Sequence, residues 1–205
     1  MRIWIAIRNI QGPEAIALFG FVSVAVMSAV QGYPYMALVV GAIGAIFIIV
    51  AAYNSYRHRS TELIDKYEER FFVRMKIERK YAAKYLLKEH EHSDELQLVL
   101  DYLEAPIADK MFSKILMEKH VFEYFRHWII MYYLASKEFI ENYYINDDAG
   151  SWAHLKPLYR KMIELKKHQY KIEFERECTE EDVIPNEEQL IRYLQQEARL
   201  KLSSD

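Results

Sequence analysis

One long stretch without charge constrains this chain more than any other feature. From Ala15 to Tyr56 there is no Asp, Glu, Lys, Arg or His. A membrane-spanning helix needs about 20 predominantly apolar residues, so the stretch is long enough for two. Its middle reads Gln-Gly-Tyr-Pro-Tyr at residues 31–35, which combines turn-forming residues with two tyrosines suited to a membrane interface. The pattern predicts a two-helix transmembrane hairpin.

The predicted fold is all-α, with an N-terminal transmembrane hairpin followed by a cytosolic helical bundle. We place an interfacial segment at residues 1–12, the hairpin at 13–56 and the cytosolic domain at 57–205. Within the hairpin, the helices are expected at 13–30 and 35–55. A cleaved signal peptide is the alternative for the first helix, but the residues before a cut after position 29 fit such a site poorly.

Positive charge predicts how the hairpin is oriented. Arg2 and Arg8 precede it, Arg57 and Arg59 follow it, and the turn between the helices carries no positive charge. Loops rich in Lys and Arg remain in the cytoplasm. We therefore expect a multi-pass protein of the bacterial inner (plasma) membrane, with both termini cytoplasmic.

Small residues recur every four positions on the second helix, at Ala37, Gly41 and Ala45. Such a stripe lets another helix approach closely. The partner is either the first helix of the same chain or a second copy, in which case the protein forms a homo-oligomer and could line a pore. The hairpin has no intramembrane charge of the kind that marks ion pathways in pumps, which argues against active transport.

The cytosolic part is acidic. Residues 1–59 have a net charge of +3 within a total of -3, so the remainder carries -6. Generalised binding to nucleic acid is disfavoured by this charge, although a local basic face can still bind an anion. Cys178 is the only cysteine, which excludes an intrachain disulfide and fits a reducing cytosol.

Hydrophobic periodicity predicts helices throughout the cytosolic part. We expect them at 61–90, from Ser93 to the Ala105-Pro106 step, at 107–145, at 152–177 and after Pro185. The segment 107–145 should hold the core, because it is dense in aromatic residues: Phe112, Phe122, Phe125, Trp128, Tyr132 and Phe139. The helix at 152–177 should bury Leu155, Leu158, Tyr159, Met162, Leu165 and Ile172.

Two clusters are candidate ligand sites. His120, Glu123 and His127 share one helical face and could bind a metal, although this spacing is common by chance and no second ligand cluster accompanies it. A narrow basic arc lies on the helix at 152–177 and is either a solvated surface or a site for RNA or lipid headgroups. The arc consists of Lys156, Arg160, Lys167 and Lys171.

The sequence contains none of the common catalytic or cofactor motifs. A phosphate-binding glycine loop, a nucleophile elbow, a cysteine metal knuckle and paired zinc-protease histidines are all missing. We therefore expect no cofactor and favour a non-enzymatic role.

Several segments resemble an uncharacterised bacterial family in which one or two membrane helices precede a small helical domain of unknown function. They are Val99–Glu104, Phe122–Tyr133, and Trp152 with Leu155 and Tyr159–Lys161. The resemblance covers roughly residues 60 to 175 and is one of aromatic and leucine pattern. It implies a fold and a topology, with no catalytic residues to carry over.

The overall layout is also similar to the membrane accessory protein of type VI, RNA-targeting CRISPR systems. That family pairs membrane helices with a domain related to HEPN nucleases and acts through oligomeric pores. HEPN nucleases use an Arg and a His separated by four to six residues, whereas Arg126 and His127 are adjacent and Arg160 and His168 are too far apart. The resemblance implies a degenerate nuclease site and a CRISPR effector or RNA as partner.

The leading expectation is a self-associating inner-membrane protein that forms pores or perturbs the bilayer in antiviral defence. A membrane-tethered ribonuclease using Arg126 and His127 is the first alternative. A passive scaffold that localises a partner protein is the second.

Overall fold

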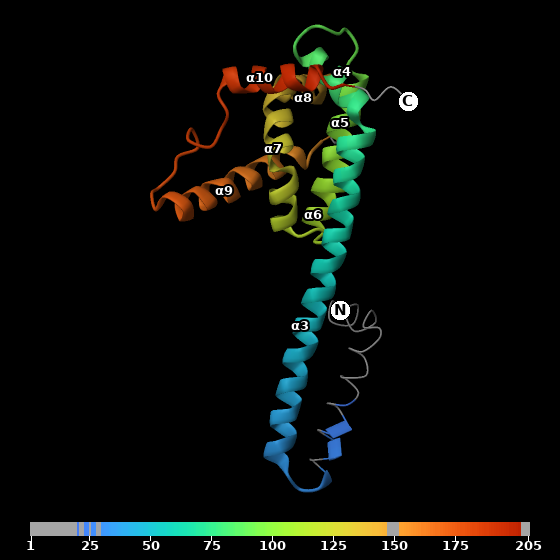
Figure 1. Ribbon diagram of the computed structural model, residues 1–205, viewed down its shortest axis with the longest axis vertical. Helices are drawn as coiled ribbons and strands as arrows, with labels where there is room; N and C mark the ends of the chain where they lie inside the picture. Colours follow the sequence, from blue (N-terminus) through green and yellow to red (C-terminus); the bar gives the residue numbers. More distant parts are fainter. Residues whose placement is uncertain (1–19, 21–22, 25, 28–29, 147–151, 202–205) are drawn as a thin grey trace. The chain divides into compact units, whose positions relative to one another are not determined.

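The described part of the chain is helical throughout (Figure 1). The computed structural model describes residue 20 and residues 23–24, 26–27, 30–146 and 152–201. The chain consists of two compact units, Met1–Arg59 and Ser60–Asp205.

The longest element is α3, which runs from Pro34 to Glu69. Neither glycine nor proline occurs between Gly44 and Pro106, so nothing in the sequence interrupts the helix after its apolar half. The stretch Leu38–Arg74 is long and apolar enough to cross a membrane, and only 11% of its most apolar 18-residue window is buried. Low burial distinguishes this segment from the core helix of a soluble protein.

The described residues include one helix of this kind. The turn before α3 is present, and Gly32 adopts a φ of 80°, a left-handed conformation that glycine reaches without strain. Most of the first expected membrane helix, residues 13–30, and all of the expected interfacial segment, residues 1–12, lie outside the described residues.

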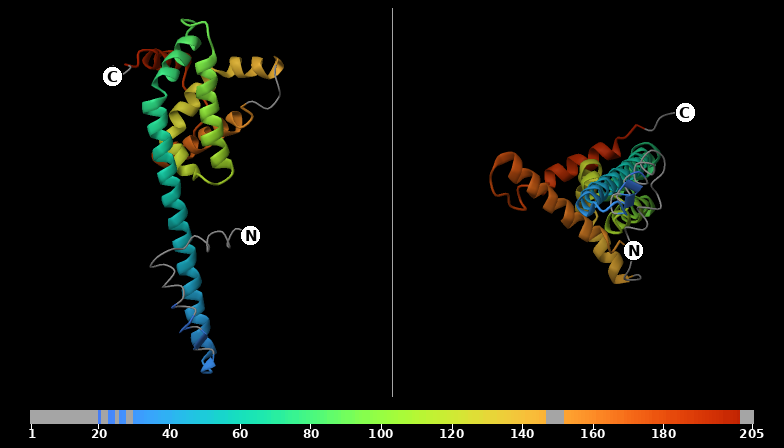
Figure 2. Two further views of the ribbon diagram at one scale, coloured as in Figure 1. Left: turned by 90° about the vertical axis from the view of Figure 1, so that its right-hand side faces the viewer. Right: turned by 90° about the horizontal axis from the view of Figure 1, so that it is seen from below.

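The second unit begins at Ser60, within α3, and continues as a bundle of shorter helices. Its elements, in chain order, are η1 (Arg70–Arg74), α4 (Lys76–Leu86), α5 (Asp94–Tyr102), η2 (Leu103–Asp109), α6 (Lys110–Phe112), α7 (Glu118–Ala135), α8 (Lys137–Asn146), α9 (Leu155–Phe174) and α10 (Glu187–Ala198). Helix α4 packs against α5 and α10, and α7 packs against α9 (Figures 1 and 2).

An aromatic cluster around Phe71 forms the centre of the bundle. The Phe71 ring is fully buried, stacks on Tyr102 at a centroid distance of 5.8 Å, and meets Phe125 and Trp128 edge-on at 5.8 and 6.0 Å. These rings come from η1, α5 and α7, so one cluster joins three elements that are distant in sequence.

Two of the segments that carried the family resemblance meet in space. Asp101 Oδ1 accepts a hydrogen bond from Trp152 Nε1 at 2.7 Å, and Glu104 Oε2 accepts one from the Trp152 backbone N–H at 2.8 Å. The carboxylates thereby fix the start of the segment that leads into α9.

Two expected boundaries were wrong, and both involve π-helical turns. The helix expected over 61–90 is interrupted by η1 at Arg70–Arg74. Pro106 was expected to end a helix but lies inside the π-helical segment η2, a wider turn in which the chain continues past a residue that has no N–H to donate. The loop expected after Asn146 lies mostly outside the described residues.

Two residues expected in the core are instead at the surface. Phe112 is 42% exposed because α6 ends there and the chain turns at Lys114, whose φ is 59°. Ile172 is 68% exposed because it lies near the end of α9, beyond the residues that α7 covers.

Candidate functional site

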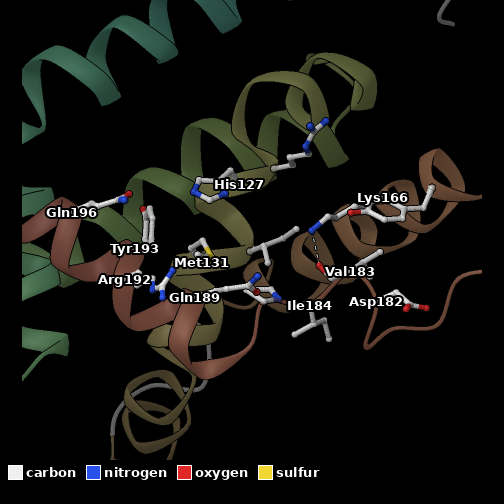
Figure 3. Close-up of a pocket in the computed structure, with 14 residues that line it drawn as sticks. His127, Met131, Lys166, Asp182, Val183, Ile184, Gln189, Arg192, Tyr193 and Gln196 are labelled. Atoms are coloured by element: carbon white, nitrogen blue, oxygen red, sulfur yellow. Dashed lines mark hydrogen bonds between the residues drawn. The ribbon is translucent and has the colours of Figure 1, made fainter. Parts of the chain in front are cut away.

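A pocket of about 430 Å³ lies among α7, α9, α10 and the segment before α10 (Figure 3). Helices α7 and α9 face each other across it, and α10 closes one side. Its lining is Arg126, His127, Ile130, Met131, Lys166, Tyr170, Asp182, Val183, Ile184, Pro185, Gln189, Arg192, Tyr193 and Gln196.

Local sequence explains how α10 begins at this wall of the pocket. Asn186 caps the helix, since its Oδ1 accepts a hydrogen bond from Gln189 N at 2.9 Å and Gln189 Oε1 accepts one from Asn186 N at 3.0 Å. This reciprocal capping box satisfies two backbone donors at the start of the helix. It places Gln189 at the pocket.

A buried ion pair holds the other end of α10. Arg79 on α4 donates from Nε and Nη2 to the two carboxylate oxygens of Glu197, at 2.8 and 2.6 Å. Arg79 also donates to the Phe71 carbonyl at 3.2 Å, and its guanidinium lies 4.7 Å from the centroid of the Phe71 ring. The residues between the cap and this ion pair therefore form a fixed wall.

Cations outnumber acids in the pocket lining. Arg126 and Lys166 contribute positive charge, Arg192 is paired with Glu188 at 2.6 Å, and Asp182 is the one acid in the lining. The Asp182 carboxylate accepts hydrogen bonds from the backbone N–H and the hydroxyl of Thr179, each at 2.8 Å, and these bonds lower its pKa. Although the domain as a whole is acidic, this hollow suits an anion.

Lys166 is the cation most closely held by its surroundings. Its Nζ donates to the Val183 carbonyl at 2.6 Å. Burial lowers the pKa of this ammonium, and the neighbouring Arg126 guanidinium lowers it further. An anion in the pocket would offset that repulsion between two like charges.

His127 is the one histidine in the pocket lining. Its ring packs edge-on against Trp128 and Tyr193, at centroid distances of 5.5 and 5.2 Å. This partial burial lowers the pKa of the imidazole, Glu197 acts in the opposite direction, and the charges of Lys166 and Arg126 add to the lowering. The net shift favours the neutral imidazole.

The expected pair of Arg126 and His127 does line one pocket, but the two side chains have different neighbours. The Arg126 guanidinium lies 4.7 Å from the centroid of the Phe122 ring and donates to Gln169 Oε1 at 3.4 Å. The His127 ring instead contacts the aromatic rings beside α10. The adjacency in sequence therefore does not create a shared hydrogen bond.

The basic arc on α9 is divided among different surroundings. Lys156 and Arg160 line a separate hollow of about 370 Å³ beside Trp152. Lys171 forms an ion pair with Glu177. None of the four arc residues lines the pocket between α7 and α10.

The three candidate metal ligands also have different environments. His120 is buried, with its Nδ1 2.8 Å from Ser60 Oγ, whereas Glu123 forms an ion pair with Lys119 at 3.6 Å. His127 belongs to the pocket. Over residues 30–146 and 152–201, no group of three His, Cys, Asp or Glu side chains is arranged to hold a metal ion.

Sequence reasoning missed Lys166 and Arg192 as pocket residues. Lys166 immediately precedes Lys167, which was assigned to the basic arc, and a step of one residue rotates a helical position by about 100°. The basic doublet was therefore a signal, but only the packing of α9 on α7 decides which lysine faces the pocket.

Comparison with known proteins yields no relative. No protein family, no curated protein and no solved structure matches this chain.

Proposed function

We propose that the protein is anchored in the bacterial inner membrane by a two-helix hairpin that includes α3, with the helical domain on the cytoplasmic side. The apolar surface of α3 is the observation that carries this proposal. Its large side chains are about half exposed or more: Leu38, Val39, Ile43, Ile46, Phe47, Ile49 and Val50. Each contributes roughly -0.3 to -0.6 kcal/mol to membrane insertion, so a bilayer stabilises a surface that water would not.

Burial along α3 supports self-association of the anchor. Gly44 and Ala51 are buried, whereas Gly41 and Ala45 of the small-residue stripe are exposed. A Cβ atom built at Gly41 meets no described atom within 4 Å. Among the described residues, Gly41 and Ala45 are thus open to the close approach of another helix, and we assign that helix to a second copy.

The proposal extends to a non-enzymatic effector that forms a pore or perturbs the membrane in antiviral defence. This part rests on the similarity of layout to the membrane accessory proteins of RNA-targeting CRISPR systems. It adds an RNA or a CRISPR effector as the partner that would trigger the protein.

The mass of the complex in mild detergent tests self-association. We expect a defined oligomer for the wild type and for Ala42→Leu, a control that adds bulk on another side of α3. Gly41→Leu should dissociate the oligomer because its side chain blocks close helix approach. If all three proteins are monomers, self-association is refuted and the hairpin is only an anchor, as a passive scaffold requires.

The cationic pocket supports a second candidate, a membrane-tethered ribonuclease. Arg126 and His127 line this pocket together with Lys166, so a phosphate group there would be within the reach of a neutral imidazole and two cations. A neutral histidine near pH 7 can accept a proton from a ribose hydroxyl.

Incubation of single-stranded RNA with the purified protein tests this candidate. We would compare the wild type with Arg126→Ala/His127→Ala and with Lys156→Ala/Arg160→Ala, which changes the other basic hollow. Cleavage that only the first double variant abolishes supports the ribonuclease. Intact RNA with the wild type eliminates it.

A further inference from the structure

The loop between α6 and α7, residues 113–117, is fixed to the first residue of the second unit. Ser60 is fully buried, and its Oγ accepts a hydrogen bond from Met117 N at 2.9 Å. The same Oγ lies 2.8 Å from His120 Nδ1. These two contacts hold the end of the loop and the first turn of α7 beside Ser60.

Chain connectivity places Ser60 near the membrane surface. Tyr56 is the last residue of the charge-free stretch, and Ser60 follows it by four residues. Four residues span at most about 14 Å in any conformation. The headgroup region on each side of a bilayer is about 5–8 Å thick, so the short connection keeps Ser60, and with it the end of the loop at Met117, close to the inner surface.

The loop presents the side chains that such a surface favours. Phe112 and Ile115 are each 42% exposed, while Met111 and Leu116 on either side of them are buried in the core. The buried pair fixes the loop, and the left-handed conformation of Lys114 makes a tight turn at its tip. Two apolar side chains therefore point outward from a rigid support.

The charges around these apolar residues suit an anionic leaflet. Lys110 and Lys114 flank them, Lys119 is paired with Glu123 at 3.6 Å, and the segment 110–119 contains one acid, Glu118. Glu118 already forms an ion pair with Lys161 at 3.2 Å. Basic residues close to an anionic surface are attracted to it within a Debye length, about 8 Å at physiological salt.

We propose that the α6–α7 loop is a second membrane contact, in which Phe112 and Ile115 enter the headgroup region and the flanking lysines bind anionic lipid headgroups. The inference rests on the proposed membrane anchor. It gives the domain a defined face toward the bilayer, in addition to its covalent connection to α3.

Fluorescence quenching by brominated lipids tests the contact. The full chain carrying Cys178→Ser is labelled with an environment-sensitive dye at Ile115→Cys and reconstituted in vesicles that contain phosphatidylglycerol. The matched control is Ile191→Cys on α10, which is 40% exposed and lies at the opposite end of the domain from α6 (Figure 1). Ile46→Cys, within the expected span, reports insertion of the anchor.

We expect strong quenching at Ile46 and several-fold more quenching at Ile115 than at Ile191. Lys110→Glu/Lys114→Glu, or vesicles of phosphatidylcholine alone, should reduce quenching at Ile115 and leave Ile46 unchanged. Phe112→Cys repeats the measurement at an independent position. Quenching at Ile46 with Ile115 and Phe112 no different from Ile191 overturns the loop contact alone, whereas no quenching at Ile46 overturns the anchor itself.

Discussion

Removing Glu197 should destabilise the domain severely. Glu197 and Arg79 expose only 8% and 4% of their side chains, and the carboxylate is bound by two guanidinium nitrogens. Glu197→Ala deletes both charge-assisted hydrogen bonds and leaves a buried guanidinium without a counter-charge. Loss of one partner from a buried pair costs about 3–5 kcal/mol, which is roughly two to four orders of magnitude in the folded-to-unfolded ratio.

After Glu197→Ala, two contacts of Arg79 remain, and they favour a cost near the lower end of the range of about 3–5 kcal/mol. Arg79 keeps its hydrogen bond to the Phe71 carbonyl and its position over the Phe71 ring. A cation over an aromatic face is worth about 0.5–2 kcal/mol, too little to replace the carboxylate. Domains of this size are stable by only about 5–15 kcal/mol, so the variant should unfold at clearly lower urea concentration.

Urea unfolding of the full chain in mild detergent, followed by tryptophan fluorescence, measures the effect, because Trp128 packs on Phe71 and Phe72. Glu188→Ala is the matched control, since it removes an ion pair to Arg192 in which both side chains are 71% exposed. Such exposed pairs contribute about 0–1 kcal/mol.

Replacing both buried partners provides a further check. Arg79→Met/Glu197→Leu should recover most of the lost stability, because no unpaired charge remains. The conclusion that the Arg79–Glu197 pair holds α10 would be refuted if Glu197→Ala lowers the free energy of unfolding by less than about 1 kcal/mol, or if Glu197→Ala and Glu188→Ala lower it equally.

Three further measurements address the pocket, the topology and the loop. Partial burial lowers the pKa of His127 below its ordinary 6.5, so its contribution to stability is present above pH 6.5 and is lost as the pH falls through the lowered value. The melting temperature should therefore fall less between pH 7 and pH 5 for His127→Gln than for the wild type. A membrane-impermeant maleimide should label Cys178 in inside-out vesicles only. In a Cys178→Ser background, it should label Tyr33→Cys in right-side-out vesicles only. The reverse pattern would overturn the proposed cytoplasmic location of the domain. Ser60→Ala leaves the Met117 N–H without its acceptor, so urea unfolding should show a loss of about 1–3 kcal/mol, and an unchanged midpoint would show that the contact holds nothing.

Local patterns in the sequence predicted the elements that depend on local physics. The apolar run of α3 and the helix after Pro185 follow from composition and from a cap within four residues of chain. The π-turns were missed because η1 places Phe71 for its contacts with α5 and α7, a tertiary requirement that no local signal carries. The same limit explains Phe112, which reads as core from its type but falls where the chain turns.

The pocket could be predicted only in part, because its charge depends on pairings across the bundle. Arg126 and His127 were considered because the resemblance to HEPN nucleases directed attention to an arginine and a histidine near each other in sequence. The wall formed by α10 depends on an Arg79–Glu197 pair whose members are 118 residues apart.

Pairing between side chains also determines which charges near the pocket can act on an entering anion, although the domain is acidic overall. Glu197 is neutralised by Arg79, and the Asp182 carboxylate is held by Thr179. The acids nearest the pocket thus have their own donors, while Lys166 and Arg126 repel each other across it. A net charge counted along the sequence gives equal weight to all of these groups, whereas an entering anion meets mainly those whose charge is not already compensated. That difference is why a chain whose residues 60–205 are acidic overall can present a cationic pocket.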